Sequence, residues 1–402
     1  MRGSGRRDYL KRNRQIKSRH DRQREETDEL QITMGNRNIR IIISGGGTGG
    51  HLFPAIAIAN ALRRIEPDVK ILFVGAEGKM EMQKVPDAGY EIVGLPVSGL
   101  VRSGSIRNIS VAFRLFRSMI RAGQIIKKFD PDVVAGVGGY ASGPVLKQAQ
   151  QRHIPTLIQE QNSYAGVTNK LLARRAVRIC VAYEGMEKYF PKEKIMLTGN
   201  PVRQVYDNLA SLRGEALRYF NLDPEMPVIL LLGGSLGAGT LNDSVCGSMD
   251  LIETSGKQMI WQTGSHYYDR MRDAAEARGV TRIRVNGFIS RMELAYAAAD
   301  VIISRAGAGT ISELALVGKP VILVPSPNVA EDHQTYNAMA LVNREAALLV
   351  RDADARDKLV ETALELVDDS TRRNSLSENI RKMAIRDADE VIAREVLKMV
   401  KR

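Results

Sequence analysis

A glycine-rich stretch is the strongest local indication of chemistry in this chain. It reads Gly-Gly-Gly-Thr-Gly-Gly-His from Gly45 to His51 and follows the apolar run 39–43. Glycines let a backbone approach an anion, and the N–H groups and dipole at the start of a following helix attract it. The stretch therefore predicts a phosphate site. Its glycines also satisfy the GxGxxG pattern of dinucleotide sites, which is weak evidence alone. A turn that only packs strand against helix is the alternative.

His51 is the candidate catalytic base. It lies where the glycine loop enters the expected helix, and Pro54 is expected in the first turn, where a missing N–H costs nothing. A helix dipole at this point lowers the pKa of an imidazole and favours the neutral form that a general base needs. The alternative is a ring that only lines the pocket or donates to a backbone carbonyl.

Further glycine-rich or polar segments follow other apolar runs. They are 138–143 (GGYASG), 233–238 (GGSLGA), 304–313 (SRAGAGTISE) and 331–337 (EDHQTYN). In open α/β sheets, ligands bind beyond the carboxyl ends of the strands. The chain therefore has more predicted anion-binding loops than the binding of one dinucleotide requires. In this reading Tyr140 and Ser142 donate to a phosphate and Glu313 accepts from ribose hydroxyls; a plain turn and a surface charge are the alternatives.

The elements that must position these loops alternate between short apolar runs and longer helical patterns. The runs are 39–43, 71–75, 131–138 and 155–160 in the first half, and 228–232, 258–264, 282–288, 300–304 and 320–325 in the second. Strands that are apolar throughout and separated by helices form parallel sheets covered on both faces. The chain is therefore predicted to be an α/β protein with two Rossmann-like domains that face a cleft.

Length and charge divide the chain further. We expect a disordered basic arm at 1–37, a first domain at 38–205, a second at 206–375 and a terminal helical segment at 376–402 that bridges back. The arm holds eleven Lys or Arg against six Asp or Glu. It lacks the apolar region of a secretory signal, and Met34 indicates an upstream start or a tag remnant. No groove-reading element accompanies it, so no nucleic-acid partner is expected.

Metal and membrane-spanning classes are not favoured. No run of 18 apolar residues occurs, and neither the histidines nor the two cysteines have metal-ligand spacing. Two DxD matches, Asp352 with Asp354 and Asp387 with Asp389, lie in the helical C-terminal region away from any strand end. We therefore expect no metal site. The cysteine pattern indicates reduced thiols and a cytosolic protein.

The stretch 98–129 combines seven Lys or Arg, no acidic residue and interleaved apolar residues. A basic amphipathic helix of this kind can lie on an anionic lipid surface. The residues assigned to this contact are Arg114, Phe116, Arg117 and Arg121. The alternative is that the apolar side is only the core face of the helix.

Seven ordered motifs give the chain a family resemblance. They are GGGTGGHLFPA, GVGGYASGP, EQNSYAGVTNKLLA, TGNPVR, GGSLGA, RAGAGTISE and DHQTYNA. In this order they resemble the MurG family, GT-B glycosyltransferases of family 28 that act in bacterial peptidoglycan synthesis. The resemblance runs from about residue 39 onward and leaves only the first 35 or so residues uncovered.

The resemblance implies a function and a set of site residues. The family transfers N-acetylglucosamine (GlcNAc) from UDP-GlcNAc to the C4 hydroxyl of the muramoyl sugar of undecaprenyl-diphospho-MurNAc-pentapeptide (lipid I), with inversion, giving lipid II. The implied donor-binding residues are Thr48, Gly49, Gly50, Asn162, Arg203, Ser235, Ile289, Ala308, Gly309, Thr310, Ile311, Ser312, Glu313 and Gln334. Among them, Arg203 and Ser235 would hold the diphosphate, Ile289 the uracil through its backbone, Glu313 the ribose and Gln334 the sugar hydroxyls. The acceptor diphosphate is assigned to Gly46, Gly47, Gly138, Gly139, Tyr140 and Ser142.

The implied partners are UDP-GlcNAc, lipid I, an anionic phospholipid surface and proteins of cell-wall synthesis and division, with no further cofactor. The expected location is the cytoplasmic face of the bacterial membrane. Alternatives are another GT-B transferase acting on a UDP-sugar, a UDP-GlcNAc 2-epimerase, which needs no acceptor, and an NAD-binding oxidoreductase. The oxidoreductase needs an acid after the second strand, for which Glu77 is the candidate, and it leaves the glycine loops of the second domain unexplained.

Overall fold

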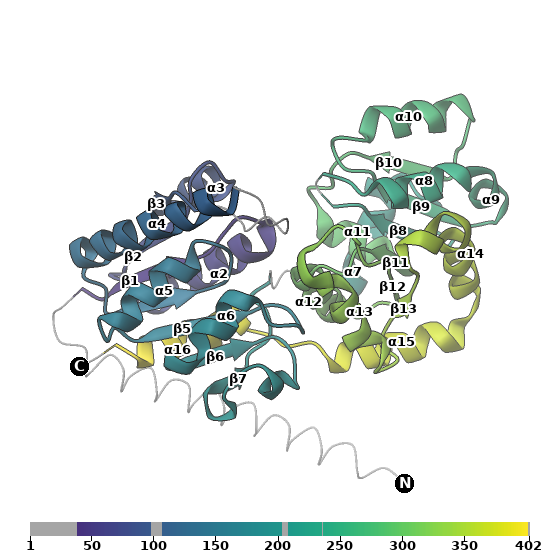
Figure 1. Ribbon diagram of the computed structural model, residues 1–402. Helices are drawn as coiled ribbons and strands as arrows, with labels where there is room; N and C mark the ends of the chain where they lie inside the picture. Colours follow the sequence, from purple (N-terminus) through teal and green to yellow (C-terminus); the bar gives the residue numbers. More distant parts are fainter. Residues whose placement is uncertain (1–37, 98–106, 203–207, 235, 401–402) are drawn as a thin grey trace, which may run out of the picture.

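The computed structural model describes residues 38–97, 107–202, 208–234 and 236–400, apart from the side chains of residues 107–112 and 330. Figure 1 shows two α/β domains side by side, each with a parallel sheet between helices. The predicted fold is therefore confirmed. The expected domain boundary at 205 falls among residues 203–207, outside the described residues, and stays a prediction.

The first sheet has seven parallel strands in the order β3-β2-β1-β4-β5-β6-β7. Their bounds are β1 Arg40–Ser44, β2 Lys70–Ala76, β3 Glu91–Leu95, β4 Val133–Gly136, β5 Thr156–Glu160, β6 Arg178–Val181 and β7 Ile195–Leu197. The helices are α2 Gly49–Ile65, α3 Glu81–Asp87, α4 Arg107–Phe129, α5 Ser142–Gln151 and α6 Val167–Leu172, with 3₁₀ turns η1 Ala173–Arg175, η2 Met186–Lys188 and η3 Lys192–Lys194. Apolar clusters cover both faces, which is why the central strands are apolar throughout.

The second sheet has six parallel strands in the order β10-β9-β8-β11-β12-β13. They are β8 Val228–Leu232, β9 Gln258–Gln262, β10 Ile283–Asn286, β11 Val301–Ser304, β12 Val321–Leu323 and β13 Leu348–Leu349. The helices are α7 Leu209–Tyr219, α8 Gly239–Gly247, α9 Met249–Thr254, α10 Tyr268–Ala277, α11 Met292–Ala298, α12 Ala308–Val317, α13 His333–Val342, α14 Ala355–Asp368 and α15 Ser370–Lys382, with 3₁₀ turns η4 Ala330–Asp332 and η5 Asp352–Asp354. All nine predicted strands are present, and β3, β6, β7 and β13 are additional.

Helix α16, Ala388–Lys398, returns to the first domain. Its apolar residues Ile392 and Val396 are fully buried in the cluster formed by β1 and α2. Arg64 on α2 also donates to Asp389 at 3.0 Å. The expected bridge back to the first domain is therefore confirmed. Residue 376, where we expected the terminal segment to begin, lies inside α15, which still packs on the second domain.

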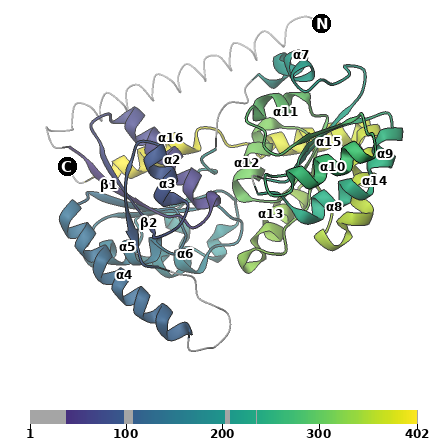
Figure 2. The same ribbon diagram turned by 90° about the horizontal axis from the view of Figure 1, so that it is seen from above.

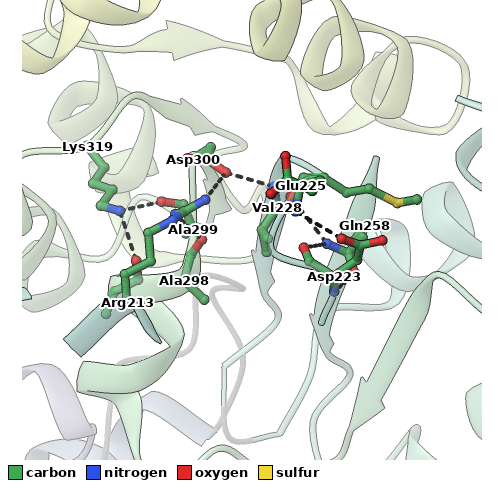
Figure 3. Close-up of polar contacts among 11 residues, drawn as sticks. Arg213, Asp223, Glu225, Val228, Gln258, Ala298, Ala299, Asp300 and Lys319 are labelled. Atoms are coloured by element: carbon green, nitrogen blue, oxygen red, sulfur yellow. Dashed lines mark hydrogen bonds and ion pairs between the residues drawn. The ribbon is translucent and has the colours of Figure 1, made fainter. Parts of the chain in front are cut away.

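A polar network supports the second sheet at the amino ends of its strands, the edge opposite the glycine loops (Figure 3). Arg213 on α7 donates to Asp300 at 3.0 Å, and Asp300 accepts from the Val228 N–H at 2.9 Å. Lys319 donates to the Ala297 and Ala299 carbonyls at the end of α11, and burial lowers the pKa of its amine to about 8. These contacts fix α7 and α11 to the sheet.

Candidate active site between the two domains

The first glycine loop connects β1 to α2 in the predicted place. Gly46 and Gly47 have φ values of +142° and +85°, which side chains rarely adopt. Thr48 is the N-cap, and α2 begins at Gly49. The helix therefore starts earlier than we expected, and Pro54 lies in its second turn rather than its first. Because proline has no N–H, that turn lacks one helical hydrogen bond.

The second glycine loop packs directly on the first. A Cβ added at Gly139 would lie 2.3 Å from the Gly46 carbonyl oxygen, and one at Gly138 would lie 2.7 Å from the His51 ring. Both glycines also have positive φ, +92° at Gly138 and +83° at Gly139. Both the close contacts and the positive φ values therefore require glycine at these two positions. The two loops form one wall, at the carboxyl ends of β1 and β4.

His51 lies in the first turn of α2, against this wall. Its Nδ1 is 3.1 Å from the Thr48 hydroxyl. Burial lowers the pKa of His51 to about 4, and the charge of His333 in the second domain acts in the same direction. A hydrogen bond to the Gly46 backbone and the charge of Glu81 act in the opposite direction. This direction agrees with the neutral imidazole that we expect, although its causes are burial and His333 rather than the helix dipole, and the neutral form stays a prediction. Catalysis by His51 stays a prediction.

Tyr140 and Ser142 follow the second glycine loop. The Tyr140 side chain is half exposed, whereas the buried Ser142 hydroxyl donates to the Gly139 carbonyl at 2.9 Å. The Gly47 N–H already donates to the Glu81 carboxylate. A phosphate at Gly47 would have to replace that carboxylate. The assignment of this wall to the acceptor diphosphate stays a prediction.

Asn162 lies where the two domains meet. Its side-chain oxygen accepts from the Asn337 amide on α13 at 3.1 Å, and the Asn337 oxygen accepts from the Ser163 N–H at 2.9 Å. Asn337 is fully buried and also donates to the Ala306 carbonyl of the second domain at 3.4 Å. The segment after β5 and the segment after β12 are therefore joined across the cleft.

Glu160 holds the Asn162 segment in place. This buried carboxylate accepts from the Asn162 N–H, the Gly166 N–H and the Asn169 amide at 2.9–3.1 Å. Burial raises the pKa of Glu160, and the hydrogen bonds oppose the rise. The sequence did not single out Glu160 or Asn337 individually, although both lie inside quoted motifs.

A second interdomain contact lies at the strand-end segment after β7. The buried Asn200 amide donates to the Ser312 hydroxyl at 3.1 Å and to the Ala308 carbonyl at 3.4 Å, so it contacts the predicted donor loop at two points. Tyr164 also stacks on Tyr336 with ring centroids 4.9 Å apart. A cavity of about 340 Å³ lies beside Asn200, between β6 and α12. Neither domain encloses this region alone.

The predicted donor residues gather at the carboxyl ends of β11 and β12. Residues 308–312 form the first turns of α12, whose leading N–H groups have no helical partner and can bind an anion. The Glu313 carboxylate is 3.5 Å from the Tyr296 hydroxyl. The Gln334 oxygen accepts from the Ala306 and Ser326 N–H groups, at 3.2 and 2.9 Å.

The remaining donor predictions divide into two groups. Ile289 has a buried side chain in the core, which is consistent with a role for its backbone, and the preceding Phe288 is 65% exposed. Arg203 and Ser235 lie outside the described residues. The donor contacts themselves stay predictions.

Acidic residues that we rejected as metal ligands form ion pairs, and Asp352 lies just after β13, so the expectation that it is away from any strand end is wrong. Arg305 contacts Asp352 at 2.5 Å, and Asp389 pairs with Arg64. Within the described ranges, no group of three or more His, Cys, Asp or Glu is arranged to hold a metal ion. Glu77, the acid considered for a dinucleotide ribose, pairs with Arg121 at 2.8 Å.

Helix α4 lies on the outer face of the first domain (Figure 2). Residues 113–117 are exposed, with Phe113 at 61% and Phe116 at 63%, whereas Ala122 and Ile126 are buried in the core. The core reading therefore holds for the buried part of the helix, and contact of the exposed part with lipid stays a prediction. None of the helices in the described part of the chain is long and apolar enough to cross a membrane.

Comparison with known protein families and solved structures shows what this chain is similar to. The N-terminal domain of glycosyltransferase family 28 matches residues 41–181, and the C-terminal domain of that family matches residues 228–392. The solved structure of MurG from Acinetobacter baumannii superposes with a TM-score of 0.74 at 28% identity, over 90% of this chain and 99% of that one. A UDP-GlcNAc 2-epimerase from Neisseria meningitidis, with a TM-score of 0.61 at 14% identity over 90% of this chain and all of that one, shares the fold.

Close relatives in sequence carry one description, UDP-N-acetylglucosamine–N-acetylmuramyl-(pentapeptide) pyrophosphoryl-undecaprenol N-acetylglucosamine transferase. The relative from Phocaeicola vulgatus is 59% identical over 90% of this chain and 96% of its own length. The one from Porphyromonas gingivalis is 55% identical over 91% of this chain and 97% of its own length. With both family domains matched in order, the chain belongs to the MurG family within glycosyltransferase family 28.

Proposed function

We infer that this chain transfers GlcNAc from UDP-GlcNAc to the C4 hydroxyl of the MurNAc sugar in lipid I, giving lipid II for peptidoglycan synthesis. The inference rests on the hydrogen bonding that joins the first-domain half of the site to the second-domain half. Asn162, beside the glycine wall of one domain, bonds to Asn337 in the helix that carries Gln334 in the other. An acceptor on the wall and a donor at α12 would therefore meet in one cleft.

The proposed reaction is a single displacement at the anomeric carbon. The acceptor O4 forms a bond to C1 of GlcNAc while the bond from C1 to the UDP oxygen breaks, which inverts the anomeric centre. The neutral His51 imidazole accepts the O4 proton, and UDP leaves with the bonding electron pair. In this proposal the N–H groups that begin α12 would stabilise the developing charge on the diphosphate, with Arg203 as the assigned side-chain partner.

Donor recognition is proposed for the second domain. Glu313 would accept from the ribose hydroxyls and the Ile289 backbone would bind the uracil. The Gln334 oxygen is engaged by backbone N–H groups, so its amide nitrogen is the group that we assign to the sugar hydroxyls. UDP-GlcNAc is the donor substrate, and we propose that no metal ion assists the departure of UDP.

The direct test is transfer of labelled GlcNAc from UDP-GlcNAc to a lipid I analogue, with and without EDTA. We expect labelled lipid II analogue, UDP in equal amount, and a rate within twofold of the untreated enzyme when EDTA is present. Absence of transfer, or consumption of UDP-GlcNAc without acceptor, contradicts the proposed reaction. Transfer that EDTA abolishes and added Mg²⁺ restores contradicts only the metal-free route.

We also propose that the enzyme binds the cytoplasmic face of the bacterial membrane peripherally, through α4. The exposed run 113–117 places two aromatic rings beside Arg114 and Arg117. Aromatic side chains suit the headgroup layer, and each cation near an anionic surface contributes about 1 kcal/mol. Arg121 contributes less in this proposal because its guanidinium pairs with Glu77. Proteins of cell-wall synthesis and division are further proposed partners.

Charge reversal on α4 tests the membrane contact. Arg114→Glu with Arg117→Glu exchanges two attractive charges for two repulsive ones, so binding to vesicles rich in anionic phospholipid should weaken by about 100-fold at low salt. Co-sedimentation measures the binding. The control is Arg218→Glu with Lys358→Glu, which alters exposed cations on α7 and α14 of the second domain. Equal binding of the two double variants would rule out α4 as the contact.

A further inference from the structure

The Glu81 carboxylate is the feature of the site that the proposed reaction does not use. Glu81 is the first residue of α3 and follows β2 by five residues, yet its side chain is completely buried. A buried carboxylate is costly unless it is hydrogen-bonded, so its partners indicate what it is for.

These partners are one N–H group of the first glycine loop and one at the end of β2. The Gly47 N–H lies 3.0 Å from each Glu81 oxygen, and the Ala76 N–H donates to Oε1 at 3.0 Å. A Cβ at Gly46 would lie 2.3 Å from Oε1, and one at Gly75 would lie 2.6 Å from the Glu81 Cγ. The backbone therefore encloses the carboxylate, and glycine at both positions makes the room.

In a phosphate-binding glycine loop, such N–H groups face the ligand. Here the Glu81 carboxylate of the protein itself accepts the hydrogen bond from the Gly47 N–H. The loop is thereby held in its positive-φ conformation before any substrate arrives. The next residue, Thr48, meets the His51 ring, and the Gly46 backbone bonds to the same ring.

We propose that Glu81 is a positioning residue for the transfer reaction: as an internal anion, it fixes the Gly46–Gly47 backbone and through it orients His51 toward the acceptor hydroxyl. The proposal rests on the proposed function for the meaning of that orientation. It assigns no contact between Glu81 and substrate. Geometric misplacement of about 1 Å at a reacting group costs roughly 100-fold in rate, which sets the size of the effect.

Two substitutions separate geometry from charge. Glu81→Ala removes every acceptor, so kcat should fall about 100-fold while KM for UDP-GlcNAc changes less than threefold, because most of the residues assigned to the donor lie in the second domain. Glu81→Gln keeps an oxygen at the Oε1 position and should lose about tenfold in kcat. The control is Glu395→Gln, which changes a buried carboxylate on α16 that pairs with Arg178 away from the site and should leave kcat unchanged.

A second readout does not depend on activity. NMR titration of the histidine rings should show that Glu81→Ala raises the pKa of His51 from about 4 toward its ordinary 6.5. Loss of the Glu81 charge by itself lowers this pKa, but water that reaches the ring through a released loop removes burial, the largest cause of the lowered value. The Glu395→Gln titration should match that of the unchanged protein. If the unchanged protein transfers no GlcNAc, the proposed function fails, and this titration still tests Glu81. A folded Glu81 variant with kcat within threefold of normal and an unshifted His51 would overturn the proposal.

Discussion

Replacing His51 with alanine should lower kcat for GlcNAc transfer by 100- to 10,000-fold, the range that general bases contribute. The KM for UDP-GlcNAc should change little, because most of the residues assigned to the donor lie in the second domain. Steady-state kinetics with a lipid I analogue measures both constants. His153→Ala is the matched control, since that exposed histidine follows the far end of α5. A His51→Ala enzyme with near-normal kcat would remove His51 as the base.

The pH dependence of the transfer rate is a second test of His51 as the base. A base acts only when deprotonated, and burial and His333 lower the pKa of His51 to about 4. The transfer rate should therefore stay level between pH 5 and 7, where a histidine of ordinary pKa would become protonated and the rate would fall. His333→Gln removes a charge that lowers the pKa of His51, so the acidic limb should move to higher pH. A limb already centred near 6.5 in the unchanged enzyme would contradict the lowered pKa of His51.

Gly139→Ala should strongly disrupt the glycine wall of the first domain. The added carbon would lie 2.3 Å from a backbone oxygen that belongs to Gly46, and the residue has φ of +83°. Neither loop can yield without moving the other, and a displaced wall carries His51 with it. We expect loss of transfer by more than 100-fold and a clear fall in the midpoint of thermal unfolding.

Gly256→Ala is the control for backbone strain alone. Gly256 has a similar φ of +75°, but no atom lies within 4 Å of an added Cβ there. This variant should cost about 1 kcal/mol of stability and leave kcat unchanged. If both alanine variants behaved alike, the loop contact would have no special importance for catalysis.

The strands that could be predicted from the sequence are the buried central ones. Runs such as 228–232 are apolar throughout because helices cover both faces of the sheet, and the sequence alone shows this. Two of the four strands that were not predicted, β7 and β13, lack the signal: β13 has two residues, and all three of β7 are at least partly exposed. Their pairing depends on neighbouring strands rather than on their own composition.

The residues of the site likewise divide into those that the sequence predicted and those that it did not. Glycine loops were recognisable because their chemistry is local. The roles of Glu81 and Glu160 were not, because a glutamate near a helix start has the same sequence whether it faces solvent or a ring of N–H groups. Asn200 and Asn337 bond across the domain interface, to residues more than 100 positions away. No spacing rule within either motif could predict those partners.

The return of α16 has a consequence for how the chain is made. The core of the first domain includes residues of α16, which the sequence places after the whole second domain. During synthesis, the face of α2 and β1 that α16 covers stays exposed to solvent until the second domain has emerged and folded. The first domain is thus completed last, and premature termination before residue 388 would leave an apolar surface as a target for chaperones or proteases.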